Sequence, residues 1–150
     1  MHFDTTGCET KEFKAAGGVA DSGDAANMTG IDCASYSIEA ADGYTLDSSN
    51  EEHEKANFFH DETGGRLNIS IFPRSPEEEV ASLEQIYEGK ETTTDHVEYN
   101  GITWLRFTGP DNGHTLFATA PATGETVRVS IGWKIDWDVA VPMMEALKLK

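Results

Sequence analysis

Two histidines and an aspartate near the middle of the chain have the residue types that bind a metal ion or activate water. Asp61 directly follows His60, and His53 lies upstream of both. Imidazole nitrogens and carboxylate oxygens are common zinc ligands, and the same groups act as general bases. The spacing of the histidines is not that of a helical zinc site, so the three residues converge only if the chain folds back between them. A small metal-binding protein or hydrolase that uses His53, His60 and Asp61 is therefore an alternative function.

Signatures of nucleophilic catalysis are missing from the sequence. There is no Gly-x-Ser-x-Gly motif, and the turn-forming residues 109–113 lack the lysine of a phosphate-binding loop. Cys33 follows Asp32 and has no basic neighbour that would favour a thiolate. With 27 acidic residues, paired carboxylates occur at almost any spacing and do not indicate glycosidase chemistry. We expect a protein that is not an enzyme and that needs no cofactor.

The two cysteines, Cys8 and Cys33, bear on the compartment of the protein. They can form a disulfide, worth roughly 3 kcal/mol in the chain-entropy description, or remain two free thiols. The small residue Gly7 before Cys8 also fits a lipid-attachment site whose apolar signal would lie upstream, so a lipid anchor could be missing from this chain. Two cysteines alone do not decide the compartment. We favour an extracytoplasmic location, cell-surface or secreted, with a cytoplasmic one as the alternative.

Large aromatic residues in the C-terminal half are the candidates for a binding surface. Trp104 lies in a predicted strand, and Trp137 lies just before the last predicted helix. Tryptophan and tyrosine are enriched where proteins bind partners, so Tyr99, Trp104 and Trp137 together would form a patch for a peptide or a sugar. Burial in the core is the alternative for at least one of the tryptophans.

The net charge of the chain excludes some classes of binding partner and favours others. There are 27 Asp and Glu residues against 11 Lys and Arg residues, which gives a formal net charge of −16. Such a charge repels nucleic acid and anionic lipid headgroups, and it favours basic partners. No apolar run is long enough for a transmembrane segment. We therefore expect an unknown protein or small-molecule partner and no nucleic acid.

Two segments have the features of amphipathic helices. The first is predicted at 76–89, where Ser75 can cap the helix and Glu78 completes a capping box. The second is predicted at 138–149, where Asp138 can act as the cap and apolar residues recur at helical spacing.

The remaining segments from residue 31 onward are predicted as short strands. Residues 33–40 alternate between apolar and polar side chains and predict one strand. Residues 61–65 and the pair Asn100–Gly101 predict hairpin turns, because Asn-Gly supplies the positive φ angles of a two-residue turn. We expect one α+β domain at 31–150, an antiparallel sheet of about six to eight strands built from hairpins, with the two helices packed on it.

Residues 1–30 differ in composition from the rest of the chain. They are rich in Ala, Gly and Asp and contain few side chains to bury. Such a segment cannot offset the entropy cost of ordering. We predict a flexible acidic and small-residue arm, or tether.

The order of these elements resembles that of PsbP-like domains. A strand leads into DGYTL, and NFFHDETGGRLNISIF then predicts a hairpin. SPEEEVASLEQIYEG begins a helix, and further strands and a closing helix follow. The resemblance covers about residues 31–150 and rests on element order, so it transfers no functional residues. It implies a binding or assembly factor, as in the bacterial lipoproteins of that family, and we expect a non-catalytic extracytoplasmic domain with an unknown ligand.

Overall fold

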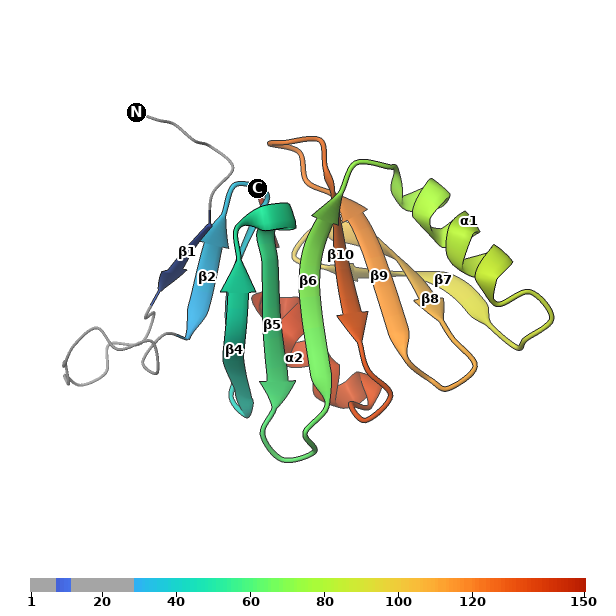
Figure 1. Cartoon of the computed structure of the whole chain (residues 1–150), viewed down its shortest axis with the longest axis horizontal. Coiled ribbons are helices and arrows are strands. Elements are labelled where there is room, and N and C mark those ends of the chain that lie inside the picture. Colours follow the sequence, from blue (N-terminus) through green and yellow to red (C-terminus); the bar gives the residue numbers. More distant parts are fainter. Residues whose placement is uncertain (1–7, 12–28) are drawn as a thin grey trace.

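The chain folds around a large antiparallel sheet (Figure 1). The structure is a computed structural model that describes residues 8–11 and 29–150. In chain order its elements are β1 (Cys8–Lys11), β2 (Gly30–Cys33), β3 (Tyr36–Glu39), β4 (Tyr44–Asn50), the 3₁₀ turn η3 (Glu52–Glu54), β5 (Lys55–His60), β6 (Arg66–Phe72), α1 (Pro76–Ile86), β7 (Thr93–Tyr99), β8 (Ile102–Thr108), β9 (His114–Thr119), β10 (Thr126–Ile131), α2 (Trp137–Ala146) and β11 (Lys148–Leu149).

The described strands form two antiparallel sheets, so the predicted α+β class is confirmed. The larger has the order β4-β5-β6-β10-β9-β8-β7, and the smaller has the order β1-β2-β3-β11. The single sheet of the prediction is thus divided in two. The segment predicted as one strand at 33–40 is also interrupted at residues 34–35, where the chain bends between β2 and β3 of the small sheet. The bend is held because the backbone N–H of Ser35 donates a hydrogen bond to the Glu54 side chain, not to a neighbouring strand.

The predicted turn residues join the strands of the large sheet as expected. Asn100 and Gly101 have φ angles of 55° and 77° and connect β7 to β8. Residues 61–65 connect β5 to β6. Both are local features, so the sequence was sufficient to predict them.

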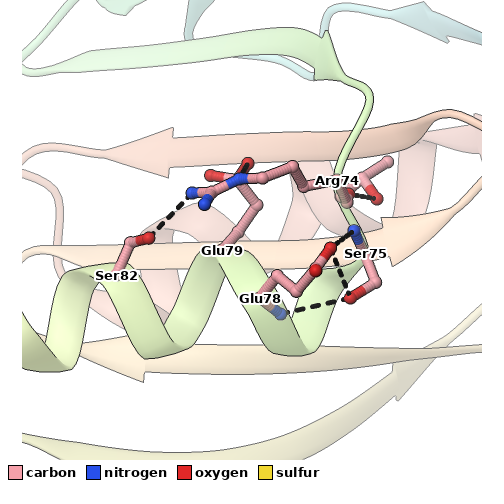
Figure 2. A network of polar contacts seen from close by, with 6 residues as sticks. Arg74, Ser75, Glu78, Glu79 and Ser82 are labelled. Atoms are coloured by element: carbon pink, nitrogen blue, oxygen red, sulfur yellow. Dashed lines mark hydrogen bonds and ion pairs between the residues drawn. The ribbon is translucent and has the colours of Figure 1, made fainter.

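Helix α1 begins where the capping box predicts (Figure 2). The Ser75 hydroxyl accepts a hydrogen bond from the Glu78 backbone N–H at 3.2 Å, and the Glu78 carboxylate accepts one from the Ser75 backbone N–H at 3.0 Å. The helix ends at Ile86, earlier than the predicted residue 89. The backbone leaves helical geometry at Tyr87, with φ −100° and ψ 22°, and Gly89 then turns the chain with φ 86°.

Helix α2 starts and ends earlier than the predicted 138–149. Its cap is Asp136, and the helix runs to Ala146. Leu147 is already extended, with φ −82° and ψ 125°, and the next two residues form β11 against β3. Pairing with the edge of the small sheet satisfies backbone groups that a longer helix would leave open.

The two faces of the large sheet pack against different partners. Trp104 and Leu116 lie on the inner face, in the main core that includes side chains of α2 and the small sheet. Phe107 and Phe117 lie on the other face and pack under α1 through Val80. Helix α1 contacts β8 and β9, whereas no described helix covers the outer side of β4, β5, β6 and β10 (Figure 1).

Residues 8–11 form β1 and pair with β2, with Cys8 opposite Cys33, instead of belonging to a tether. Gly30, at the end of the predicted arm, begins β2, and residues 1–7 and 12–28 lie outside the described residues. Neither of the two described helices combines the length and hydrophobicity that crossing a membrane requires.

Candidate functional site

The structure does not bring His53, His60 and Asp61 together. His53 precedes β5 and His60 ends it, so a six-residue strand lies between them. At about 3.3 Å per residue the ends of that strand are roughly 17 Å apart. His53 is exposed, whereas His60 is nearly buried beside Tyr44, with ring centroids 5.0 Å apart. The sequence alternative of one metal site from these three residues therefore fails because the chain between the histidines is extended.

The His60 and Asp61 side chains both have polar partners nearby in the fold. The His60 Nδ1 and Thr63 hydroxyl are 2.9 Å apart, and Asp61 accepts a hydrogen bond of 2.6 Å from the Thr45 hydroxyl. Both side chains thus stabilise the β5–β6 turn and its neighbour β4.

The structure joins Cys8 and Cys33 in a disulfide, one of the two states that the sequence left open. The cysteines are paired across β1 and β2, with Cα atoms 4.0 Å apart. Their sulfurs and a Glu54 oxygen are the described ligand-type atoms that cluster within 4.8 Å. Sulfur in a disulfide is not the thiolate that binds metals, so this cluster does not indicate a metal centre.

The predicted aromatic surface is divided between core and surface. Trp104 is 1% exposed and belongs to the main core, so its side chain forms no part of a surface patch. Tyr99 and Trp137 lie side by side and half-buried, with ring centroids 6.3 Å apart. Their role in binding stays a prediction.

The Trp137 ring contacts a charged and an aromatic side chain of the same chain. The Arg106 guanidinium lies 4.5 Å from the centre of the ring, and His114 approaches it at 5.1 Å. Asp95 accepts hydrogen bonds of 2.9 and 2.6 Å from Arg106, and these bonds lower the pKa of the Asp95 carboxyl. Burial, and then the charge of Arg106, lowers the pKa of His114 and favours its neutral form. These contacts therefore orient a cation over an aromatic ring.

A separate cavity lies between the end of α1, the β8–β9 turn and the segment after β10. We call it the aromatic groove. Its volume is about 210 Å³, and its lining includes Leu83, Tyr87, Phe107, Asp111 and Trp133. A larger hollow, of about 530 Å³ between β3 and the C-terminal segment, has no aromatic side chain in its lining. Aromatic lining is typical of partner sites, so the aromatic groove is the better candidate.

Exposed apolar side chains surround the aromatic groove. Trp133 is 62% exposed, Tyr87 is 37% exposed, and the adjacent Ile86 is 71% exposed. The Tyr87 ring lies 5.8 Å from that of Phe107, which continues the groove into the core under α1. Trp133 was not among the predicted site residues. The signal that could have found it is its position after Gly132, outside both the strand and the helix that would bury it.

The lining of the groove also contains Asp111, His114 and Ser130, but their contacts do not form a catalytic triad. His114 Nδ1 is 3.0 Å from the Thr108 hydroxyl, and Asp111 accepts a hydrogen bond of 3.1 Å from Gly113 N–H. A triad needs the acid to orient the histidine and the histidine to contact the serine. As placed here, the three residues therefore do not form the relay that acyl transfer by a serine triad requires. Comparisons of the chain with protein-family models, curated proteins and solved structures found no match.

Proposed function

We propose that the protein is a non-catalytic, extracytoplasmic binding or assembly domain whose aromatic groove binds a segment of a partner protein. The segment would insert an apolar side chain between Trp133 and Tyr87. The observation that supports this is the 62% exposure of Trp133 beside a cavity of about 210 Å³. Exposed tryptophan and tyrosine around a cavity are typical of residues that dominate binding energy.

The expected contribution of such an anchor is large enough for a specific interaction. Removing apolar surface from water contributes roughly 25 cal/mol per Å². An anchor that covers about 100 Å² would thus contribute about 2.5 kcal/mol before the cost of association is subtracted.

The negative charge of the protein indicates which residues the partner segment has beside its apolar anchor. The protein has a net charge of −16, Asp111 lines the groove, and Glu88 directly follows Tyr87 in the sequence. Lysine or arginine residues beside the apolar anchor would complement these carboxylates and speed association. We therefore assign the groove to a basic segment with one apolar anchor.

The disulfide and the element order support the other parts of the proposal. A disulfide such as Cys8–Cys33 persists in oxidising compartments, which favours an extracytoplasmic location. The order of strands, α1, strands and α2 is the order on which the resemblance to PsbP-like binding and assembly domains rests.

Selection of short peptides on the immobilised protein tests the proposal. We expect the selected sequences to share an apolar residue flanked by Lys or Arg. A synthetic peptide of that pattern should bind at least 10-fold more weakly to the Trp133→Ala variant in isothermal titration calorimetry. Trp137→Phe is the matched control, because it alters the other partly exposed tryptophan and should leave the affinity unchanged.

Two results would contradict this assignment. Equal affinity of the peptide for the wild type and Trp133→Ala would exclude the aromatic groove. Loss of binding in Trp137→Phe alone would instead place the partner at the Tyr99–Trp137 surface. The protein would then still be a binding domain, but its binding site would not be the aromatic groove.

A further inference from the structure

A second surface lies on the uncovered side of β4, β5, β6 and β10, which we call the outer face (Figure 1). The register places polar side chains in one row across these strands. Ser48 pairs with Asn57, Asn57 with Asn68, and Asn68 with Ser130. At about 4.8 Å between strands, this row of amides and hydroxyls is roughly 14 Å long.

Arginine residues are concentrated on the same face. Arg66 lies 5.6 Å from the ring centre of Phe59, and Arg128 lies 4.4 Å from that of Phe72. Arg74 lies at the edge of the face, where α1 begins. Three of the four arginines of an acidic chain therefore lie on one surface.

One nitrogen of the Arg128 guanidinium, Nε, is buried without an acceptor. No carboxylate of the described residues forms an ion pair with Arg128. Leaving a buried charged donor unsatisfied is costly, and the stacking on Phe72 holds the group in place. Burial lowers the pKa of Arg128, and the charge of Glu79 opposes this effect.

Nearby carboxylates pair with two of the four cations of this face. Glu79 accepts a hydrogen bond of 3.1 Å from Arg74, which also donates to the Ser82 hydroxyl at 2.7 Å (Figure 2). Asp47 is paired with Arg66 at 3.0 Å, and Asp61 lies at the turn that ends β5. Lys55, which lies on the same face at the start of β5, forms no ion pair with a described residue. Within the described part of the chain, two cations, Lys55 and Arg128, are thus left without a carboxylate partner.

We propose that the outer face binds an anionic polysaccharide whose sugars have carboxylate groups, with Arg128 as a carboxylate contact and the row of Asn57, Asn68 and Ser130 as hydroxyl contacts. A guanidinium in a fixed orientation forms paired hydrogen bonds with a carboxylate. Amide and hydroxyl side chains supply both the donors and the acceptors that sugar hydroxyl groups need.

Two other anionic chains fit this surface less well. Single-stranded nucleic acid stacks its bases on bare aromatic rings, whereas Arg66 and Arg128 cover Phe59 and Phe72. An acidic peptide gains most by pairing its backbone with a strand edge, and the middle of a sheet face offers no free backbone groups.

Isothermal titration calorimetry with polygalacturonate tests the proposal. We expect the wild type to bind, and we expect the Arg128→Met variant, which retains the apolar stem over Phe72, to bind at least 10-fold more weakly. Lys90→Met, on the loop after α1, is the control for the loss of one positive charge and should bind as the wild type does. Ser130 also lines the aromatic groove, and Trp133 shares a cavity with Arg66. Tyr87→Ala, at the end of α1, is therefore the variant that separates the two sites, and it should bind as the wild type does.

The melting temperature of Arg128→Met distinguishes a role of Arg128 in ligand binding from a role in the stability of the fold. Because the buried Arg128 Nε has no hydrogen-bond partner and methionine retains an apolar contact with Phe72, Arg128→Met should melt at the wild-type temperature or higher. If that variant fails to fold, Asn68→Asp provides the test, since its carboxylate should repel the polymer and weaken binding at least 10-fold. No binding by the wild type, unchanged binding in the folded variants, or equal binding of poly-glutamate would each overturn the proposal.

Discussion

Glu54 is only 2% exposed, and its carboxylate accepts a hydrogen bond of 3.0 Å from the backbone N–H of Ser35. The Tyr36 hydroxyl donates a bond of 2.7 Å to the Glu54 carbonyl oxygen. His53 and Glu54 have positive φ angles of 59° and 46°, a conformation that costs non-glycine residues about 1 kcal/mol or more. These contacts join the β2–β3 turn to the start of β5, and so they connect the small sheet to the large one.

The first prediction concerns the pH dependence that this buried carboxyl produces. Burial is the main cause that raises the pKa of Glu54, so the folded state holds the proton more tightly than the unfolded state. Its contribution to stability is complete below the unfolded pKa of about 4.3 and is lost as the pH rises through the folded pKa. Glu54→Gln retains an acceptor but does not titrate. We expect its free energy of unfolding at pH 7 to be within about 1 kcal/mol of the wild-type value, or higher.

Urea unfolding at a series of pH values checks this prediction. The stability of Glu54→Gln should change less between pH 4 and pH 7 than that of the wild type. Glu62→Gln removes an exposed carboxylate in the β5–β6 turn and is the matched control. An unchanged pH profile in Glu54→Gln would show that the carboxyl does not titrate in this range.

Reduction of the disulfide should destabilise the protein. The bridge spans a sequence separation of 25 residues, and closing such a loop constrains the unfolded chain by about 3 kcal/mol. Reductant should therefore lower the melting temperature by roughly 10 °C. The double variant Cys8→Ser, Cys33→Ser should melt at this lower temperature and should not respond to reductant. Identical melting of the wild type with and without reductant would argue against the bridge.

The hydrogen bonds between Asp95 and Arg106 should contribute modestly to stability. Asp95→Asn loses a charged acceptor, and we expect a loss of about 1 kcal/mol at pH 7, because the pair is partly exposed. The pKa of Asp95 is lowered in the folded state, so this stabilisation is present above the unfolded pKa and disappears as the pH falls through the folded pKa. The two proteins should therefore become equally stable at acidic pH. Glu98→Gln, on the same strand, should show no such difference.

Two tryptophan substitutions should change the free energy of unfolding by very different amounts. Trp104→Ala creates a cavity in the main core and should cost about 3–5 kcal/mol in urea unfolding. Trp133→Ala removes an exposed side chain and should change stability by less than about 0.5 kcal/mol. A large loss of stability in Trp133→Ala would mean that its ring packs within the fold and is not available to a partner.

Local features of the sequence determined the type and order of most elements. The Ser75–Glu78 capping box and the Asn100–Gly101 turn act over a few residues, so their outcomes do not depend on the rest of the chain. Alternating apolar residues then required sheets with a buried face, and the two amphipathic segments required helices packed on them. The α+β class followed from these local requirements.

Tertiary structure decided how those elements combine and which side chains remain accessible. Trp104 and Trp133 have the same side chain, but Trp104 is buried in the main core, whereas Trp133 lies in the segment after β10 and is exposed. The separation of His53 from His60 depended on the extended path of β5, and the choice between a disulfide and free thiols depended on the pairing of β1 with β2. These outcomes rest on contacts between residues distant in the sequence, which local patterns do not encode.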